Sequence, residues 1–545
     1  MVSAGAQTAC TYRRQGLLIF VFCLALYTLT HAGRIMHGDD ETMYRVVRNI
    51  IERGDIAISH EVIQVPAIGY AGLLPTHAYE FETTFATPGR GGRAYSKYGI
   101  GQSLLAIPLY LAGKITVLLV REANFQIYTK LFVTLVNPVL SALACTTLFF
   151  LIMRLGYPQR IALFLTFAYG FSTMAWAYAK SFFSEPAVTW LFLLAALSLL
   201  RIDGQRVARL MAQVGIALGA AILFRVSAAI ALPAFALALA LRLRETGNET
   251  WPIRGWAAFF AGPLIAGVVT LAYNWARFNS WFSTGYTEVA WDNPFIIGFY
   301  GQLFSSGKSI FLYNPVLIAA PVGLGLLVRR QRSLVFLVAA LTITYLLAHA
   351  PYNYWTGGWN WGPRFLLPVV PFLVLALAPL LTGAYRRMGW ALVIILALAG
   401  LFLTLPAILV DHSRHLIALS EQYGESFYTR SIFEPSLSPA FRQWPAAVAV
   451  LRLFGEPGAR QALQAALERD LTIEPMKVAP LDRASARLSY QAELLRLNAP
   501  DFWWLHLYFL QHASLTPLAV ICAGLIVCIG LTGLTLFLSC VVERG

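Results

Sequence analysis

Residues 128–153 have the sequence YTKLFVTLVNPVLSALACTTLFFLIM, in which Lys130 is the only charged side chain before Arg154 ends the run. About 20 mostly apolar residues are enough for a helix to cross the hydrocarbon core of a bilayer. The run therefore predicts a membrane-spanning helix. Similar apolar runs recur along the 545-residue chain.

The composition supports the same interpretation for the whole chain. Hydrophobic residues make up 58% of it and charged residues only 12%, whereas an ordinary soluble domain carries about 25% charged residues. So few charges could not keep a surface of this size in water. This excludes a soluble multidomain protein, and we predict an all-α polytopic membrane protein.

The basic excess is explained by membrane topology. Lysine and arginine number 41 against 27 acidic residues, which gives a net charge of +14. The basic residues come in short clusters between apolar runs, such as Arg13-Arg14, Arg329-Arg330 and Arg386-Arg387. Cytoplasmic loops carry such clusters, whereas a nucleic-acid partner would require them on one soluble face. We therefore expect membrane lipid, and no nucleic acid, as a partner.

The same clusters predict how residues 99–120 lie. If this apolar stretch crossed the membrane, every later basic cluster would face outward, against the positive-inside rule. Pro108 and Lys114 also interrupt it, so we expect a half-buried helix in the outer interface. The run near 16–32 is expected to remain as the first helix, with the N-terminus inside; a cleaved signal peptide is the alternative.

About twelve transmembrane helices follow from this choice. They lie near residues 16–32, 128–153, 161–179, 186–201, 209–224, 226–243, 255–273, 309–328, 334–349, 365–382, 389–410 and 514–540.

Three parts of the chain are expected. Residues 1–410 form a transmembrane catalytic module whose first outer loop covers 33–127. Residues 411–513 form a small, mainly helical extracytoplasmic segment. Residues 514–545 hold the last helix and a cytoplasmic tail.

The cysteines and histidines indicate no metal site. All six cysteines lie in the N-terminal tail or in apolar runs, which supports neither a disulfide framework nor a zinc site. The nine histidines show no ligand spacing. We expect no cofactor, while a divalent ion in the reaction stays open.

Three adjacent carboxylates, Asp39, Asp40 and Glu41, follow the first predicted helix and precede Tyr44. Acidic residues are favourable at the positive end of a helix, so these could simply begin a solvated helix. Carboxylates beside a membrane are also natural general bases. Both interpretations stay open from this motif alone.

Cations near the predicted outer helix ends are the second candidate group. A charge at membrane depth costs free energy unless it has a partner or a task. The candidates are Lys97, Lys180, Arg225, Lys308 and Arg364. Lys97 adjoins Tyr98, and Lys180 could pair with Glu185; Tyr286 and Trp361 lie in aromatic outer loops, where rings suit either sugar stacking or an aromatic belt.

Together these groups predict a chemistry. Carboxylates, cations and aromatic rings on one outer face fit an anionic lipid-linked substrate whose transferred group passes to a hydroxyl or amine. A carboxylate would activate the acceptor, and the cations would stabilise negative charge on a departing phosphate.

The chain resembles the GT-C superfamily of membrane glycosyltransferases, especially the bacterial family-39-type enzymes related to protein O-mannosyltransferases and aminoarabinose transferases. The motifs that carry the resemblance are Asp40-Glu41-x-x-Tyr44, Tyr95-Ser96-Lys97-Tyr98-Gly99, Ser184-Glu185-Pro186, Gly285-Tyr286 and Trp361-Gly362-Pro363-Arg364. Each motif is short, but the order of the motifs and their predicted side of the membrane agree with the pattern of this superfamily.

The resemblance implies a polyprenyl-phosphate-linked sugar donor and a catalytic base in the first outer loop. The base would be Asp40, which heads Asp-Glu-x-x-Tyr, with Asp39 as the alternative, and Glu41 would orient the acceptor or Asp40. Lys97, with Arg225 or Arg364, would bind the phosphate. Some relatives carry arginine where Met43 stands here, so part of the phosphate contact must come from elsewhere.

The resemblance also implies transfer with inversion, which suits one base and one leaving group on opposite faces of the anomeric carbon. A retaining enzyme needs a second carboxylate about 5 Å away, and Asp39, Asp40 and Glu41 are too close in sequence to serve opposite faces. The acceptor, whether lipid, glycan or protein, is not identified.

The expected location is a bacterial inner membrane, with the site on the extracytoplasmic side. A transporter or flippase of lipid-linked saccharides, with the same cations and no chemistry, is the alternative function. Carriers usually bind near the midplane between repeats, whereas these charges crowd the outer helix ends.

Overall fold

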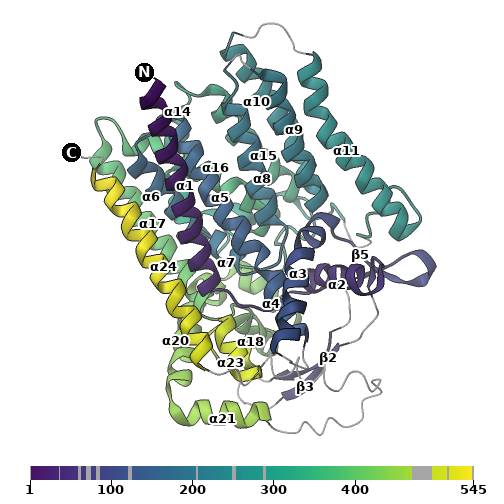
Figure 1. The fold of residues 1–545 in the computed structure, drawn as a ribbon. Helices are drawn as coiled ribbons and strands as arrows, with labels where there is room; N and C mark the ends of the chain where they lie inside the picture. Colours follow the sequence, from purple (N-terminus) through teal and green to yellow (C-terminus); the bar gives the residue numbers. More distant parts are fainter. Residues whose placement is uncertain are drawn as a thin grey trace.

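A computed structural model gives the structure of the chain, shown in Figure 1. It describes residues 2–542 except 36, 59–62, 69–74, 82–85, 121–124, 204–205, 248–252, 287–289, 469–493 and 512–514. Long helices, most of them lying side by side, build the described part of the chain. The predicted all-α polytopic membrane fold is confirmed.

Nine helical segments of the described chain are long and apolar enough to cross a membrane. They are α3 (Ile100–Val120), Gln126–Arg154, which covers most of α4 (Phe125–Thr134) and all of α5 (Val136–Arg154), α9 (Val207–Phe224), Val226–Glu245, which includes α10 (Leu232–Glu245), α11 (Ile253–Phe278), α15 (Arg332–His349), Arg364–Leu381, α17 (Arg386–Leu409) and Thr516–Ser539 within α24 (Leu515–Val542).

Shorter helices occupy other predicted spans. They are α6 (Gln159–Phe171) with α7 (Ala175–Ala179), α8 (Glu185–Leu200), and α13 (Ile310–Tyr313) with α14 (Ala320–Leu327). The helix predicted near 16–32 is α1 (Val2–Leu29), which begins earlier in the chain than expected. α12 (Phe295–Phe304) lies in a predicted outer loop.

The predicted span 365–382 is a broken helix at the centre of the bundle. It consists of the 3-10 turn Arg364–Val369, α16 (Val370–Leu375) and the 3-10 turn Ala378–Leu381, and 89% of the span is buried. Proline lacks an amide hydrogen and clashes with the preceding turn, and this span contains Pro368, Pro371 and Pro379. The broken span begins at Arg364 and so brings this arginine into the interior.

The first loop contains short strands that the sequence did not predict. α2 (Gly38–Arg53) lies across the end of the bundle in Figure 1. After it, β1 (Ala57–Ile58), β5 (Ala94–Ser96) and β4 (Ala86–Pro88) form an antiparallel sheet in that order. β2 (Ile63–Ile68) pairs antiparallel with β3 (Pro75–Phe81). The sheet places the Lys97-Tyr98 pair directly after a strand.

α3 is the helix predicted for the outer interface. Gly101 in its first turn lies against the backbone of Phe224, the last residue of α9. Val117 in its last turns packs in a cluster with α4 and with Trp503 of α23 (Trp503–Gln511). Both ends of α3 therefore lie at the same end of the bundle, as the predicted arrangement requires, although its length and composition alone would allow it to span. Its depth in a membrane stays a prediction.

The 411–513 segment is helical where it is described. It contains α18 (Ser413–Tyr423), α19 (Phe427–Phe433), α20 (Pro439–Gly455), α21 (Pro457–Glu468) and α23. α24 follows and lies along α1 (Figure 1). The first and last long helices therefore pack together at one edge of the bundle.

Glycine allows α9 and α11 to pack backbone to backbone. Gly215 and Gly219 of α9 are four residues apart and lie on one face, against Phe259 and Gly262 of α11. Small residues at this spacing let membrane helices approach closely. A side chain at any of these three glycines would collide with backbone atoms of the other helix.

We predict that Gly215→Ala lowers the free energy of unfolding by about 1–3 kcal/mol, because the added methyl group overpacks this contact. Thermal unfolding of the purified protein in detergent measures the change. Gly267→Ala is the matched control, since no atom lies within 4 Å of a methyl group added there. Equal stability of both variants would contradict the close approach.

Candidate functional site

Arg364 lies buried between two carboxylates. Its Nη1 is 2.9 Å from Asp39 Oδ2, its Nε is 2.8 Å from Glu185 Oε1, and its side chain is 7% exposed. The guanidinium also lies over the ring of Phe183, 4.2 Å from the ring centre. Burying a charge is costly unless it is paired, and these contacts supply the pairing.

A second arginine extends this pair into a line of alternating charges. Arg225 Nη1 lies 2.7 Å from the same Glu185 Oε1, and its side chain is 20% exposed. The order is Asp39, Arg364, Glu185, Arg225, and we call these four residues the charge line. Asp39 and Glu185 lie in the first turns of α2 and α8, where acidic groups are favoured. Arg225 occupies the extended break after α9.

Asp39 and Asp40 face different surroundings although they are adjacent. Asp39 is 15% exposed. Burial alone would raise the pKa of Asp39, but Arg364 and a hydrogen bond from Tyr98 outweigh it, so this pKa is lowered. Asp40 is fully buried; its Oδ2 accepts a hydrogen bond from the Phe182 amide at 3.1 Å, and burial raises its pKa well above the usual value. Asp39 is therefore the ionised one of these two adjacent carboxylates, and it is the one that pairs with Arg364 in the charge line.

Lys97, Tyr98 and Tyr286 form the other side of the Asp39 surroundings. The rings of Tyr98 and Tyr286 meet edge to face at 6.1 Å. The ammonium of Lys97 lies 5.9 Å from the first ring centre and 5.4 Å from the second. Arg277 supports this loop, because its guanidinium donates hydrogen bonds to the Ser96 carbonyl and to the Tyr98 carbonyl.

Glu41 and Tyr44 have their contacts elsewhere. Glu41 pairs with Arg45 at 3.0 Å and with Lys130 at 2.9 Å. Burial would raise its pKa, but these two cations lower it to about 2. Tyr44 is buried, and its hydroxyl lies 2.7 Å from Thr129 Oγ1. These contacts join α2 to α4 and do not reach the charge line.

Lys180 is bound inside the protein and does not pair with Glu185. Its ammonium donates hydrogen bonds to the carbonyls of Ile408 at 2.6 Å and Asp501 at 3.0 Å, and it lies 3.1 Å from the Asp501 carboxylate. Asp501 also pairs with Arg34 at 3.0 Å. Lys180 thus ties the turn before α8 to the 411–513 segment.

Lys308 organises the tryptophan-rich loop 350–364. It is buried, and its ammonium donates to the carbonyls of Gly358 at 2.8 Å, Asn360 at 2.7 Å and Gly362 at 3.3 Å. Burial, with a contribution from Arg364, lowers its pKa to about 7. Its three donors are used by the loop that carries Arg364.

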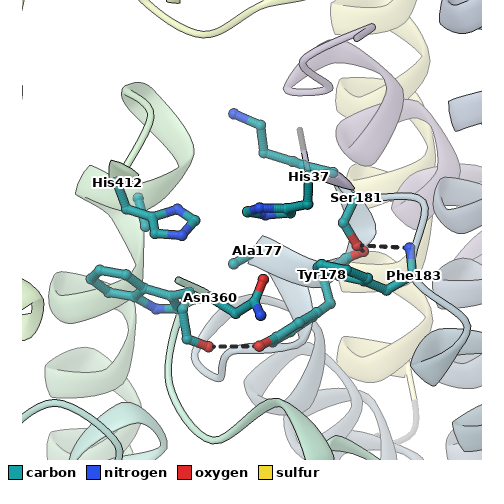
Figure 2. Close-up of a pocket in the computed structure, with 10 residues that line it drawn as sticks. His37, Ala177, Tyr178, Ser181, Phe183, Asn360 and His412 are labelled. Atoms are coloured by element: carbon teal, nitrogen blue, oxygen red, sulfur yellow. Dashed lines mark hydrogen bonds between the residues drawn. The ribbon is translucent and has the colours of Figure 1, made fainter. Parts of the chain in front are cut away.

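A small cavity lies beside the charge line, between the turn before α8 and the 411–513 segment. Figure 2 shows His37 and His412 on facing sides of this cavity, with Asn360 between them. Asn360 Oδ1 and Trp361 Nε1 are buried and have no hydrogen-bond partner among the residues that the structure describes. Phe183 forms a shared wall, since its ring stacks on His37 at 4.9 Å and also contacts Arg364. The cavity can therefore accept a group that both donates and accepts hydrogen bonds.

No motif in the sequence marked three residues of this region as members of the site. His37 directly precedes the carboxylates, and its position there was the only signal. His412 lies in the 411–513 segment, where no pattern marks it; its Nε2 lies 2.9 Å from the Trp359 carbonyl. Arg277 had the same signal as Arg225, an arginine at the end of an apolar run among aromatic residues.

Within the described residues, no group of three or more histidine, cysteine, aspartate or glutamate side chains is arranged to hold a metal ion.

No family model matches the chain, and no curated protein matches it. Several solved structures do, and three of them follow. The crystal structure of ArnT from Cupriavidus metallidurans bound to undecaprenyl phosphate is 11% identical, with a TM-score of 0.43, over 90% of this chain and 77% of that one. The apo form of the same protein is 13% identical, with a TM-score of 0.44, over 91% and 78%.

The third structure is the apo oligosaccharyltransferase of Archaeoglobus fulgidus, 11% identical with a TM-score of 0.42, over 89% of this chain and 64% of that one. At identities and TM-scores this low, the matches do not identify the activity of the chain. The activity has to be inferred from the chain's own residues.

We predict that Lys180→Met lowers the free energy of unfolding by about 3–5 kcal/mol, because it leaves the buried Asp501 carboxylate short of a partner. Lys114→Met is the control: this exposed lysine lies 3.5 Å from Glu52, and such a pair contributes about 1 kcal/mol or less. Thermal unfolding in detergent compares the two.

We expect the free energy of unfolding to depend on pH through Asp501. Burial would raise its pKa, but Arg34 and Lys180 lower it to about 2, against about 3.9 in an unfolded chain. Its contribution to stability is therefore fully present above pH ~3.9 and is lost as the pH falls through about 2.

Proposed function

We propose that this chain is an inverting glycosyltransferase of the GT-C superfamily. It moves a sugar from a polyprenyl-phosphate donor to a lipid, glycan or protein acceptor at the outer face of a bacterial inner membrane. The observation that supports this most strongly is the charge line, in which the two carboxylates Asp39 and Glu185 alternate with two arginines at the ends of apolar helices.

The charges suit the donor and the leaving group. The two acids and two arginines of the charge line balance, and Lys97 adds one positive charge beside Asp39. A polyprenyl-phosphate sugar carries one negative charge and gains a second on the departing phosphate as the bond to the sugar breaks. Cations fixed near that oxygen stabilise the transition state more than the ground state. Arg225, Arg364 and Lys97 are the groups we assign to this task.

Asp39 is the base in this proposal. A general base must be ionised and within reach of the acceptor hydroxyl, and Asp39 meets both conditions better than the buried Asp40, which the motif favoured. Phosphate bound to Arg364 would weaken the hold of this arginine on Asp39 and place a second negative charge nearby. Both effects would raise the pKa of Asp39 and make it a stronger base when the donor is present.

The aromatic residues and the cavity suit the sugar. Tyr98 and Tyr286 offer ring faces beside Asp39, and the cavity offers the donor Trp361 Nε1 and the acceptor Asn360 Oδ1 to a hydroxyl group. In this proposal one side of the charge line meets the phosphate, and the cavity side meets a hydroxyl of the sugar or of the acceptor.

We expect Asp39→Asn to reduce transfer by about 10²–10⁴-fold, the usual contribution of a general base. Asp40→Asn should retain more activity, because that carboxylate bonds to backbone. The assay follows release of polyprenyl phosphate from a panel of undecaprenyl-phosphate sugars, and NMR of the product gives the anomeric configuration.

The outcomes separate the assignment of the base from the function. If Asp40→Asn alone abolishes transfer, the base is Asp40. If the wild-type protein binds undecaprenyl phosphate but transfers no sugar from any donor, carriage without chemistry replaces the proposed reaction. A product with the donor's own configuration would contradict inversion.

We also expect Lys97→Ala to weaken binding of undecaprenyl phosphate about tenfold, which is about 1.4 kcal/mol, because an ammonium beside the phosphate is lost. Microscale thermophoresis of the purified protein gives the dissociation constant. Lys114→Ala, which removes an exposed lysine paired with Glu52, is the matched control. Unchanged affinity of the Lys97 variant would remove this lysine from the phosphate site.

A further inference from the structure

α17 presents an apolar stripe to the surroundings of the bundle. Every third or fourth residue on one side of this helix is an exposed hydrophobic residue, at 44–68% exposure: Met388, Leu392, Ile395, Leu398 and Phe402. Residues at this spacing share one face of a helix. Because α17 is a candidate membrane span, lipid tails are the natural partner of this stripe.

α20 continues the stripe although it belongs to the 411–513 segment. Phe441, Val448 and Leu451 are exposed on one side of α20, and Trp444 lies on the same side. The Trp444 ring packs on Phe402 at 5.0 Å, and its Nε1 donates a hydrogen bond to the Phe402 carbonyl at 2.8 Å. The apolar face of α20 is therefore continuous with the lipid-facing side of α17.

The contact between Trp444 and Phe402 lies within the membrane span α17, before its last residue. Phe402 comes seven residues before Leu409, the last residue of α17, which is about 10 Å along a helix. On the inner face of α20, Gln443 Nε2 donates to the Val410 carbonyl at 3.2 Å, and Ala447 and Val450 pack against Val410. The first turns of α20 thus lie alongside the last turns of α17.

The chain before α20 is fixed to the bundle. The Gly307 amide donates to the Ile432 carbonyl at 2.9 Å, and Ser306 Oγ donates to the same carbonyl at 3.1 Å. Ser438, which caps α20, donates its hydroxyl to the Ser306 carbonyl. α20 is therefore held against the membrane part at its start.

The side of α20 next to this stripe is more polar. It carries Arg442 and Ala449 together with the exposed Leu453, and Arg452 lies at the border of the stripe. Arginines that flank an apolar stripe are typical of helices at the headgroup level, where they contact lipid phosphates. The distribution of side chains around α20 therefore matches a membrane surface with one side in lipid.

We propose that α20 is a membrane-contacting helix. Its stripe Phe441, Trp444, Val448 and Leu451 inserts into the leaflet at the Leu409 end of α17, and its arginine side faces the headgroups. The 411–513 segment would then rest on lipid, with part of it in the leaflet, and would not be a domain surrounded by water. This proposal does not depend on the reaction.

Spin labels test it in the full chain. Single cysteines replace Phe441, Arg442, Val448 or Ala449 in a background without the six native cysteines, and the protein is placed in nanodiscs that contain anionic lipid. Electron paramagnetic resonance then measures collisions with oxygen, which concentrates in lipid, and with the water-soluble Ni-EDDA complex. We expect severalfold higher oxygen-to-nickel accessibility ratios at 441 and 448 than at 442 and 449.

Equal ratios at neighbouring positions, with high nickel accessibility, would show that water covers the stripe and would overturn the proposal. Low accessibility to both probes at 441 and 448 would overturn it in favour of a protein partner. A second measurement keeps the native cysteines: benzoylphenylalanine at 441 should crosslink to phospholipid, detected by mass spectrometry, whereas the same residue at 449 should not.

Discussion

The buried guanidinium of Arg364 and its two carboxylates form the interaction on which the site depends. An unpaired charge in such surroundings is strongly unfavourable, and removing one member of a buried pair leaves the other exposed to that cost. The first turn of α2, the first residue of α8 and the start of the broken span Arg364–Leu381 must therefore meet at one point. Three segments far apart in the sequence are thereby fixed to each other.

The cations of this region differ in what binds them, and this difference separates structure from proposed function. Lys180 and Lys308 are surrounded mainly by backbone carbonyls, which cannot leave without unfolding a loop. Arg225 and Arg364 are bound by carboxylate side chains, for which an incoming phosphate can compete. The sequence showed only that each cation lay near a helix end, so it grouped them together.

Much of the fold could be predicted because apolar length and helix spacing are local properties. The run at 128–153 and the long helices after it follow from hydropathy. The span 365–382 was predicted as one helix, whereas its prolines break it. The short strands of the first loop were missed, since the paired residues of β1 and β5 are 36 and 38 positions apart in the sequence. The motif favoured Asp40 over Asp39 as the base, but adjacent residues point about 100° apart on a helix, and only packing decides which of the two meets Arg364.

The sequence by itself determined that the chain is a helical membrane protein, and it singled out residues that the structure brings together around Arg364 and the cavity: Asp39, Lys97, Tyr98, Glu185, Arg225, Tyr286, Trp361 and Arg364. It could do so because charges and polar motifs are rare in an apolar chain. Only the tertiary structure decided that Glu41 and Tyr44 support α2, that Lys180 and Lys308 stabilise loops, and that His412 comes to the cavity. Those outcomes depend on which groups, distant in the sequence, come together in a low-dielectric interior. The residue type at one position does not determine which distant residues it will contact.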